Sequence, residues 1–414
     1  MTTWGPTELV LENLLDSEEI HAENDGEEYR YPNYGLSWSK YIYKDLKSGE
    51  KLHLFACCGG KKAEIVALQK DNPEAPLRPW STFIDDDPDE KFRATEFGGK
   101  STSGSPFLIL GGKATIIKLV DIDRRCLAHA LKGHTYMVND LKVSPKHESL
   151  LLSAAADESI RMWNLNVPAC IAVFAGRHGH RKAVLSISWH FEGESFASSG
   201  ADGYVRLWNG LSDVNVLEAL HATRPMPGES VVRGRPYYDL YPRFASNKLH
   251  ASPVDCVHWL RDGRMLSRCM DNEFLVWEPD FSSVERQKRD LTLVTYPPAK
   301  EVVVFMRFQA AGRPNYFSRF SVDALDEQLA VGEAGTTSIW NLDGEEMDDV
   351  SLDDTELAFA DDDWLDHRLD PSQTLSIQNR ERVRVAAFCP HGKILVACSD
   401  EGNLYQWRPS ANQH

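Results

Sequence analysis

The sequence predicts an all-β protein with the fold of a seven-bladed β-propeller, and three observations support this prediction. Segments of about 45 residues recur along the chain with the same polar residues at the same offsets. Aromatic residues make up 10% of the chain, including 11 Trp and 13 Tyr, which favours β-sheet. The 414 residues also exceed the usual size of a single core, and a repeat architecture avoids that limit because each unit packs only on its neighbours.

Three segments show the repeat most clearly. KGHTYMVNDLKVSPKHESLLLSAAADESIRMWNL and HGHRKAVLSISWHFEGESFASSGADGYVRLWNG both begin near a Gly-His pair and end with Asp, five residues and Trp. A third copy contains VDCVHWL and keeps the spacing between Ser, Asp and Trp. The equivalent residues are His134, Ser153, Asp157 and Trp163 in the first, His180, Ser198, Asp202 and Trp208 in the second, and His250, Ser267, Asp271 and Trp277 in the third.

Weaker copies bring the total to seven. Two follow the third copy, with Trp340 and Trp407 in register, and two precede the first, in LHLFACCGGKKAEIVALQ and SPFLILGGKATIIKLVDID. Seven units at this period are typical of WD repeats, in which each unit is a four-stranded antiparallel sheet. We expect an acidic N-terminal extension over residues 1–27 and a propeller over 28–414, with insertions at about 210–248 and 343–372.

The recurring His, Ser, Asp and Trp could be mistaken for a hydrolase triad, but their repetition indicates a structural role. Within one unit they can form a buried chain of hydrogen bonds, in which the indole N–H donates to Ser and Asp orients the imidazole that contacts the hydroxyl. A catalytic triad occurs once per active site, whereas this set occurs three times at a fixed period. We therefore expect no catalytic residue.

Other apparent sites also have structural interpretations. FGGKS at 97–101 lacks the glycine that a phosphate-binding loop requires at position 94, which is Ala94, and GGKAT at 111–115 lacks the spacing and the hydroxyl after lysine. Both are predicted to be hairpin turns. The eight cysteines form no C-x-x-C pair or zinc-ligand spacing, so we expect mostly buried free thiols and neither a metal nor a cofactor.

The net charge of −17 is concentrated in one segment. Residues 343–370 hold thirteen acidic residues and one basic residue, so they carry −12 of that charge. The segment is predicted to be a solvated loop or, alternatively, to attract a basic partner such as a histone tail. Because the chain has no excess of positive charge, we expect no direct, sequence-specific binding of nucleic acid.

The sequence also argues against a membrane partner. No stretch reaches the roughly 20 apolar residues that a membrane span requires. The N-terminus lacks the basic start and apolar run of a secretory signal, so we expect a cytosolic or nuclear protein.

Most of the chain resembles the embryonic-ectoderm-development/extra-sex-combs (EED/ESC) family, the WD-repeat propeller subunit of the Polycomb repressive complex. VDCVHWL, preceded by a long insertion, is the most specific of the matching runs. The others include the first two repeats quoted above and NYFSRFSVDALDEQLAVG. The acidic segment and the first residues of the chain lie outside the likeness.

The resemblance implies a non-catalytic scaffold in the nucleus that supports transcriptional repression and heterochromatin. One face would bind a SET-domain histone H3 lysine methyltransferase, together with other Polycomb complex subunits. The other face would hold the trimethylated histone H3 tail in an aromatic cage through cation–π attraction. The positions that correspond to the cage and to the peptide contacts are Trp38, Phe92, Arg93, Asn139, Asp255, Tyr316, Phe317, Arg319 and Arg384.

Arg93 is the main departure from the family pattern, because it stands where the family has a cage Tyr. A guanidinium repels a quaternary ammonium and removes one ring face, unless Phe92 or Tyr41 supplies a substitute. The N-terminal cage position is Trp38 or, without a one-residue slip of the alignment, Ser39.

Two further alternatives remain open at the level of sequence. Tyr316 and Phe317 are either cage aromatics or strand aromatics that pack at the end of a sheet. The chain itself could be a scaffold that has lost methyl-lysine recognition, or a WD-repeat adaptor of a ubiquitin ligase. VDCVHWL and the insertion at about 210–248 favour the Polycomb interpretations over the adaptor.

Overall fold

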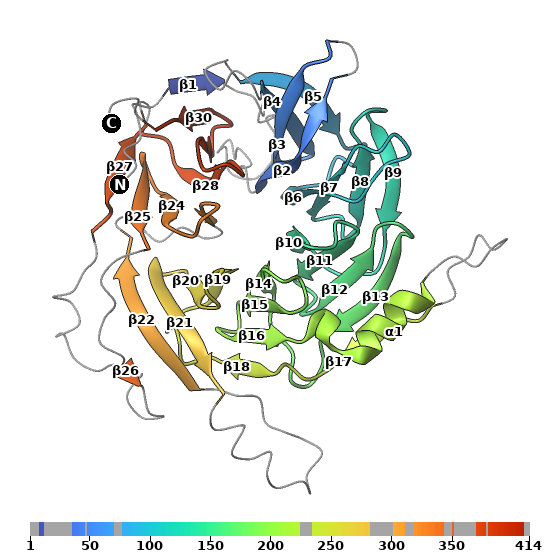
Figure 1. The fold of residues 1–414 in the computed structure, drawn as a ribbon, viewed down its shortest axis with the longest axis vertical. Helices are drawn as coiled ribbons and strands as arrows, with labels where there is room; N and C mark the ends of the chain where they lie inside the picture. Colours follow the sequence, from blue (N-terminus) through green and yellow to red (C-terminus); the bar gives the residue numbers. More distant parts are fainter. Residues whose placement is uncertain are drawn as a thin grey trace, which may run out of the picture. The chain divides into compact units, whose positions relative to one another are not determined.

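The structure, a computed structural model, consists almost entirely of antiparallel sheet (Figure 1). It describes residues 8–11, 35–45, 48–69, 77–223, 234–281, 301–310, 318–342, 350–351, 370–377 and 380–409. The chain divides into two compact units. Unit 1 comprises Met1–Leu141, Phe317–Asp343 and Pro371–His414, and unit 2 comprises Lys142–Tyr316 and Gly344–Asp370.

The described residues form seven separate sheets, which are the seven predicted blades of a β-propeller. Four sheets belong to unit 1, with the strand orders β2-β3-β4-β5, β6-β7-β8-β9, β23-β24-β25-β27 and β1-β30-β29-β28. Their strands are β1 (Glu8–Leu11), β2 (Gly35–Lys44), β3 (Lys51–Gly59), β4 (Lys62–Gln69), β5 (Arg78–Ile84), β6 (Phe92–Gly98), β7 (Phe107–Gly112), β8 (Ile117–Asp121), β9 (Cys126–Leu131), β23 (Phe320–Val322), β24 (Gln328–Gly332), β25 (Thr336–Asn341), β27 (Gln373–Ser376), β28 (Val383–Phe388), β29 (Leu395–Ser399) and β30 (Leu404–Trp407).

The other three sheets belong to unit 2, apart from the first residues of β10. Their orders are β10-β11-β12-β13-β17, β14-β15-β16-β18 and β19-β20-β21-β22-β26. The elements are β10 (Val138–Val143), β11 (Leu150–Ala155), β12 (Ile160–Asn164), β13 (Ala169–Phe174), β14 (Val184–Trp189), β15 (Phe196–Gly200), β16 (Val205–Trp208), the 3-10 helix η1 (Gly210–Ser212), α1 (Val214–Ala222), β17 (Tyr237–Asp239), β18 (Phe244–Ser246), β19 (Val254–Trp259), β20 (Met265–Cys269), β21 (Glu273–Asp280), β22 (Glu301–Gln309) and β26 (Val350–Ser351).

Apolar side chains fill the spaces between neighbouring sheets of unit 1. One buried cluster joins the β2–β5 sheet to the β6–β9 sheet and includes Leu54 and Leu108. A second joins the β2–β5 sheet to β28–β30 and includes Phe55 and Val396, and a third, with Trp407, joins β28–β30 to the β23–β27 sheet. Each sheet of unit 1 is thus stabilised by burying apolar side chains against the next one.

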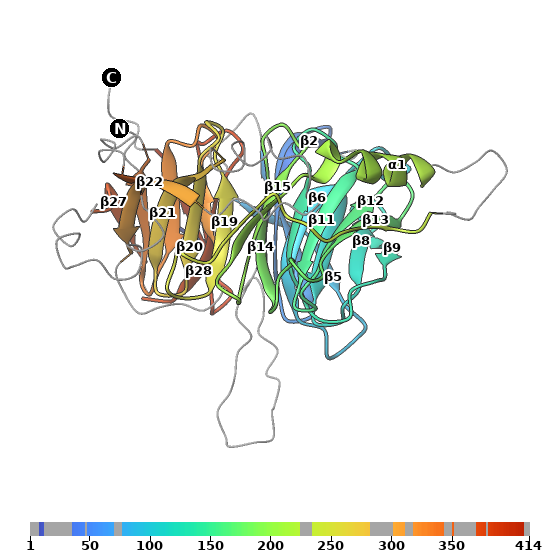
Figure 2. The same cartoon turned by 90° about the horizontal axis from the view of Figure 1, so that it is seen from below.

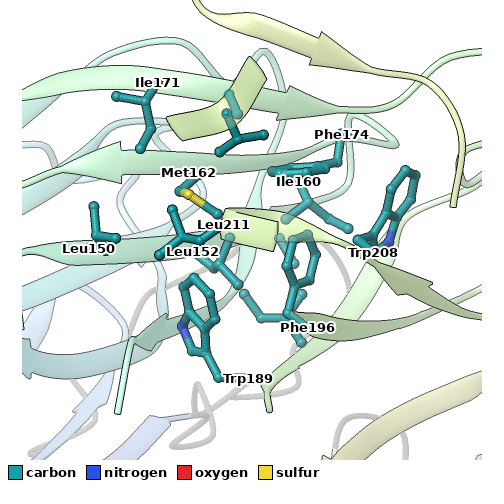
Figure 3. Packing of buried hydrophobic residues seen from close by; sticks show 14 of the residues in the cluster. Leu150, Leu152, Ile160, Met162, Ile171, Phe174, Trp189, Phe196, Trp208 and Leu211 are labelled. Atoms are coloured by element: carbon teal, nitrogen blue, oxygen red, sulfur yellow. The ribbon is translucent and has the colours of Figure 1, made fainter. Parts of the chain in front are cut away.

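Unit 2 shows the same kind of packing between the β11–β13 strands and the β14–β16 strands (Figure 3). The rings of Phe174 and Phe196 meet edge to face, with centroids 4.7 Å apart and an interplanar angle of 84°. Phe174 also lies 5.6 Å from the ring of Trp208. Such aromatic pairs contribute about 0.5–1.5 kcal/mol beyond the area that they bury.

The N-terminal segment contributes a strand to the last sheet. β1 pairs antiparallel with β30, with Glu8 opposite Gln406 and Leu9 opposite Tyr405. β1 lies inside residues 1–27, which the sequence predicted to be an extension, so the boundary at residue 28 is wrong for these four residues. The two ends of the chain therefore complete one sheet together.

The predicted insertion at about 210–248 is in part a strand of the propeller itself. β18 pairs with β16 and completes the fourth sheet, although it lies within the predicted insertion. The rest holds α1, which begins where the Asp213 carboxylate accepts from the backbone N–H of Asn215 at 2.9 Å. α1 lies against β13, and β17 pairs in parallel with the same strand (Figures 1 and 2). Most of the predicted insertion at 343–372 lies outside the described residues.

The remaining structural predictions can be compared directly with the strands. β6 and β7 form a hairpin across the 97–101 segment, and β7 and β8 form one across 111–115, as predicted. All eight cysteines are free: six are buried, Cys170 is half-buried and Cys126 is exposed on β9. Among the described residues, no helix has the length and apolar character needed to cross a membrane.

The second repeat forms its predicted hydrogen-bond network in full, which we call the second network. Trp208 Nε1 donates to Ser198 Oγ at 2.9 Å, and this hydroxyl lies 2.8 Å from His180 Nε2. His180 Nδ1 lies 2.9 Å from Asp202 Oδ1, and Arg206 donates to the other carboxylate oxygen at 2.9 Å. All of these side chains are buried or nearly so, and the network satisfies their polar atoms.

The first repeat forms the matching bond between indole and hydroxyl. Trp163 Nε1 donates to Ser153 Oγ at 2.8 Å, and His134 is buried. The Asp157 carboxylate accepts from the Ser159 hydroxyl at 2.6 Å. The indole partner predicted from the repeat spacing is therefore confirmed in this repeat as well.

The third repeat departs from the prediction at its acidic residue. Trp277 donates to Ser267 at 3.0 Å, and Ser267 Oγ lies 2.8 Å from His250 Nε2. His250 Nδ1, however, lies 3.0 Å from Glu273 Oε2, whereas Asp271 is exposed and accepts from another hydroxyl. The prediction that Asp271 orients this imidazole is wrong, and Glu273 takes its place. We call His250, Ser267, Glu273 and Trp277 the third network.

The residue beside the imidazole explains the change. Gly200 and Cys269 are equivalent, because they pair with Val184 and Val254 at the start of the first strands of their sheets. A Cβ on Gly200 would lie 2.8 Å from His180 Nδ1 and 3.1 Å from the aspartate oxygen. A side chain at this position thus takes the space that an aspartate carboxylate needs beside the imidazole. In the third repeat the longer side chain of Glu273 reaches the imidazole of His250 from the next strand, β21.

Candidate functional site

Several predicted site residues occupy the same bulged position in their sheets. In four sheets the pairing of the first strand with the second strand shifts register at the second residue of the first strand. A bulge of this kind changes the direction of one side chain. The bulged residues are Arg93 in β6, Leu185 in β14, Asp255 in β19 and Arg384 in β28. Asn139 is likewise the second residue of β10.

In unit 1 the structure brings Arg93, Asn139 and Arg319 together. Arg93 Nη1 lies 3.5 Å from Asn139 Oδ1, and Arg319 Nη2 donates to the Asn139 carbonyl at 3.1 Å. Arg319 Nη1 also lies 3.9 Å from Asp140 Oδ2. Both arginines are partly exposed, whereas Asn139 and Asp140 are buried. Two guanidinium groups thus contact one asparagine, one at its side chain and one at its backbone, with a single carboxylate among these contacts.

Arg384 joins this cluster through the backbone. The Arg319 N–H donates to the Arg384 carbonyl at 2.8 Å, so the two residues are neighbours across adjacent sheets. Arg384 Nε donates to Asp400 Oδ1 at 2.6 Å. Burial raises the pKa of Asp400 more than the arginine contacts lower it. We call Arg93, Asn139, Arg319 and Arg384 the arginine cluster.

Trp38 lies in unit 1 on β2, where its ring is half-buried. Its indole N–H donates to the Ala387 carbonyl at 3.2 Å, and its ring centroid lies 4.7 Å from that of Phe55. Ser39, the alternative at this position, is buried and contacts the backbone of Tyr41. Of the two alternatives for this cage position, Trp38 therefore offers a partly accessible aromatic ring, whereas Ser39 is buried.

Phe92 is excluded as a cage residue. Its side chain is 0% exposed and packs in the cluster between the first two sheets of unit 1. The Lys118 ammonium also lies 5.3 Å from its ring centroid. Because the bulge follows Phe92 directly, Arg93 rather than Phe92 is the partly exposed residue of this pair. The cage role predicted for Phe92 is therefore wrong.

Tyr41 is the other substitute considered for the missing cage ring. It is half-buried on β2, and the ammonium of Lys40 lies 5.6 Å from its ring centroid. The Lys40 ammonium therefore already makes the cation–π contact that a methylated lysine would make with this ring.

The remaining predicted residues do not join the arginine cluster in the described part of the chain. Asp255 lies in unit 2, is 1% exposed, and accepts from Arg268 Nη1 at 3.0 Å. Arg268 is itself buried and also donates to Asn272 at 2.6 Å. Asp255 therefore belongs to a buried ion pair. Tyr316 and Phe317 lie outside the described residues.

Two acidic residues of the site were missed by the sequence analysis. Asp140 and Asp400 pair with Arg319 and Arg384, yet neither stands at a position that the repeat spacing marks. The available signal is a polar or charged residue at the second position of several first strands. It points to Arg93, Asn139 and Arg384, but not to Arg319, which precedes β23, or to the acidic partners.

The chemistry of the arginine cluster favours hydrogen bonding to a polypeptide. Arginine offers five N–H donors in a planar fork, which suits carbonyl and carboxylate oxygens. The same charge disfavours a cationic ligand at close range. Without an aromatic ring at position 93, the described residues offer the half-buried Trp38 ring to a methylated lysine, because the Lys40 ammonium already lies over the ring of Tyr41.

Comparison with known proteins agrees with the repeat analysis. The family described as WD domain, G-beta repeat, matches residues 125–164, 169–209 and 370–408. These matches include the first and second repeats and the last one.

Named Polycomb proteins are similar to this chain over most of its length. Polycomb protein esc of Musca domestica is 27% identical over 385 residues, which cover 92% of this chain and 82% of that protein. Polycomb group protein FIE2 of Zea mays is 29% identical over 291 residues, 70% of this chain and 72% of that protein. Over most of its length this chain resembles the WD-repeat proteins of the EED/ESC family. The predicted resemblance is therefore confirmed.

Solved structures support the propeller fold of this chain. A chain of the Chaetomium thermophilum Polycomb repressive complex 2 is 19% identical, with a TM-score of 0.71 and coverage of 98% of both chains. A chain of ctPRC2 in complex with H3K27me3 and H3K27M is 18% identical, with a TM-score of 0.72 and the same coverage. At this identity the likeness establishes the fold.

Proposed function

We propose that this chain is the propeller subunit of a Polycomb-type histone H3 lysine methyltransferase complex. The observation that carries the proposal is its likeness to Polycomb esc proteins over 92% of its length, together with the same fold as chains of Polycomb repressive complex 2. It acts in the nucleus, where chromatin is, and supports repression by holding a SET-domain methyltransferase and the other Polycomb subunits together.

The chain contributes no catalytic residue to this complex. Its recurring His, Ser and acidic residues are engaged with buried indoles and arginines, which gives them a structural role. The methyl-transfer chemistry belongs to the SET-domain subunit. A ubiquitin-ligase adaptor would share the WD repeats but is not favoured, because the named relatives are Polycomb proteins.

Assembly is tested by co-expressing this chain with the SET-domain Polycomb subunit of the same genome. We expect the two to co-purify at equal stoichiometry and the enzyme to methylate histone H3 in nucleosomes only when this chain is present. Methylation at the same rate without the chain, or failure to co-purify with all Polycomb subunits supplied, would contradict the proposal.

The arginine cluster is the candidate binding site for the histone H3 tail. Arg93 and Arg319 each place a guanidinium within 3.5 Å of an oxygen of Asn139, and such a set of donors beside an amide suits the backbone of an extended peptide. Arg93 also weakens selection for a trimethylated lysine, because its charge repels the quaternary ammonium and it lacks the ring face of an aromatic residue.

Calorimetric titration with trimethylated and unmethylated H3 peptides tests this assignment. We expect Arg93→Tyr to raise the affinity for the trimethylated peptide by about 2- to 30-fold, the range that a cation–π contact of about 0.5–2 kcal/mol supplies. The matched control is Arg124→Tyr, because that arginine is exposed in the turn between β8 and β9 and is not a member of the cluster. Equal changes in both variants, or no binding by any of them, would remove the tail site while leaving the assembly role intact.

A further inference from the structure

The third network brings three metal-ligating groups to one place. His250 Nδ1, the Cys269 thiol and a Glu273 carboxylate oxygen lie within 4.8 Å of one another. His250 and Cys269 are buried and Glu273 is partly exposed, so the cluster has access to solvent on one side. We propose that this cluster is a zinc site, with these three side chains as ligands and a water molecule as the fourth.

The distances suit a small tetrahedral ion. His250 Nδ1 and Glu273 Oε2 are 3.0 Å apart, and a zinc ion would space such donors about 3.3–3.6 Å apart given its bond lengths. Imidazole, thiolate and carboxylate are the ligand types that zinc takes in proteins. Three protein ligands and one water form its usual open site.

The groups that orient metal ligands are already in place. His250 Nε2 lies 2.8 Å from Ser267 Oγ, and Ser267 is fixed by Trp277. Arg307 Nε donates to Glu273 Oε1 at 2.7 Å, which leaves Oε2 directed at the imidazole. Ligating histidines and carboxylates are typically held in this way by partners behind them, and such partners support metal affinity.

The same position in the other clear repeats lacks a ligand. The residue equivalent to Cys269 is Gly200 in the second repeat and Ala155 in the first. The acid of the second network is held by Arg206 and by the backbone N–H of Arg181 at 3.0 Å. The chain thus carries an internal comparison, in which one network has a thiol and the others have none.

Binding has a defined proton balance. Burial raises the pKa of Cys269 to about 11, so the free thiol is protonated. When zinc binds, the S–H bond breaks, the Zn–S bond forms, and the thiol proton goes to solvent. The proton that His250 Nδ1 shares with Glu273 moves to Nε2 of the same ring. The Nε2–H group then donates a hydrogen bond to the Ser267 hydroxyl oxygen. One proton is released per ion, so affinity rises with pH.

The experiment titrates the full chain with Co²⁺ as a spectroscopic probe and with Zn²⁺ as competitor. All samples carry Cys126→Ser, because the exposed Cys126 thiol would bind metal by itself. The test variant is Cys269→Ala, which copies Ala155 of the first repeat. The control is Cys256→Ala, which removes another buried thiol on the neighbouring strand β19.

We expect one Co²⁺ per chain, with strong visible absorption of a tetrahedral ion and a near-ultraviolet band from cobalt–thiolate charge transfer. Zn²⁺ should abolish both signals and raise the melting temperature of Cys256→Ala but not of Cys269→Ala. The Cys269→Ala affinity should fall by more than about 100-fold, since even loss of an orienting partner costs about 10- to 100-fold.

Two outcomes would overturn the proposal. Retention of the spectrum in Cys269→Ala would mean an adventitious ion only, bound elsewhere. Absence of any tetrahedral spectrum in the folded Cys256→Ala protein would mean that the cluster does not open to a metal. Neither result depends on the Polycomb partners, so the assembly proposal is tested separately.

Discussion

The second and third networks solve the same problem with different residues. Each buries a tryptophan whose indole donates to a serine, and each places an imidazole on that serine. In the second network Gly200 leaves room for Asp202, whereas in the third Cys269 fills that space and Glu273 acts instead. Both repeats therefore need a carboxylate beside the imidazole, but the repeat spacing does not decide which acidic residue provides it.

The largest expected difference between the networks concerns the two aspartates. Asp202→Ala leaves the buried Arg206 and His180 without their carboxylate, and we expect it to lower the free energy of unfolding by about 3–5 kcal/mol. Asp271→Ala should lower it by less than about 0.5 kcal/mol, because Asp271 is exposed and outside its network. Urea unfolding followed by tryptophan fluorescence measures both. Equal losses would mean that the networks are built alike after all.

The second difference concerns the residue beside the imidazole. Gly200→Ala places a Cβ 2.8 Å from His180 Nδ1 and 2.9 Å from a backbone carbonyl, so we expect a loss of about 1–3 kcal/mol from overpacking. Cys269→Ala removes one buried atom and should cost about 1 kcal/mol. The same urea unfolding, run without metal, checks both values. A neutral Gly200→Ala would refute our explanation for the change of acid.

The third expected effect sharpens the role of Glu273. Glu273→Gln keeps an acceptor for His250 but removes the charge that Arg307 contacts, and we expect a loss of about 1–2 kcal/mol. Arg307 is half-exposed, so water compensates for part of the lost contact. The matched control is Glu278→Gln on the same strand β21, where the side chain is exposed. Thermal unfolding of the two variants side by side decides whether Glu273 belongs to the network.

The smallest expected effect is a difference in pH dependence. Burial by itself would raise the pKa of Asp202, but the hydrogen bond from His180 and the charge of Arg206 hold it well below its usual range. Because the folded pKa is depressed, the unfolded state binds the proton more readily. The stability contributed by Asp202 is therefore present above about pH 4 and is lost as the pH falls further.

The same direction holds for Glu273, whose pKa is lowered by His250 and Arg307 against the effect of burial. We expect Asp202→Asn to flatten the loss of stability below about pH 4 by up to about 1.4 kcal/mol per pH unit, and Glu273→Gln to flatten it less. Urea unfolding repeated from pH 6 to pH 3 measures both slopes. A wild-type stability that rises on acidification would have the wrong sign.

Much of the fold could be predicted from the sequence. The offsets between Ser and Trp identified the indole–hydroxyl pairs in three repeats, and all three are formed. These contacts lie close together in the chain, between adjacent strands of one sheet, so a fixed spacing is enough to determine them. The seven units and the two hairpins at 97–101 and 111–115 could be predicted for the same reason.

The candidate site could be predicted only in part. The resemblance assigned Arg93, Asn139, Arg319 and Arg384 to the family's cage and peptide-contact positions. The structure brings these four residues together in unit 1. It also assigned Phe92 and Asp255 to the site, but both are buried, and one lies in the other unit. Burial depends on the neighbouring sheet, which the sequence of one strand does not contain.

The sequence by itself determined the period, the blades and the need for a polar partner at each buried indole, because these follow from local spacing and from hydrogen bonding. Only the tertiary structure decided which side chain meets that need. The bulge at Arg93 leaves that residue partly exposed while its neighbour Phe92 is buried. The Cys269 thiol beside His250 takes the space of an aspartate, so Glu273 rather than Asp271 contacts the imidazole. The pairing of β1 with β30 likewise joins opposite ends of the chain. In each case the decisive atom belongs to a segment that becomes a neighbour only after folding.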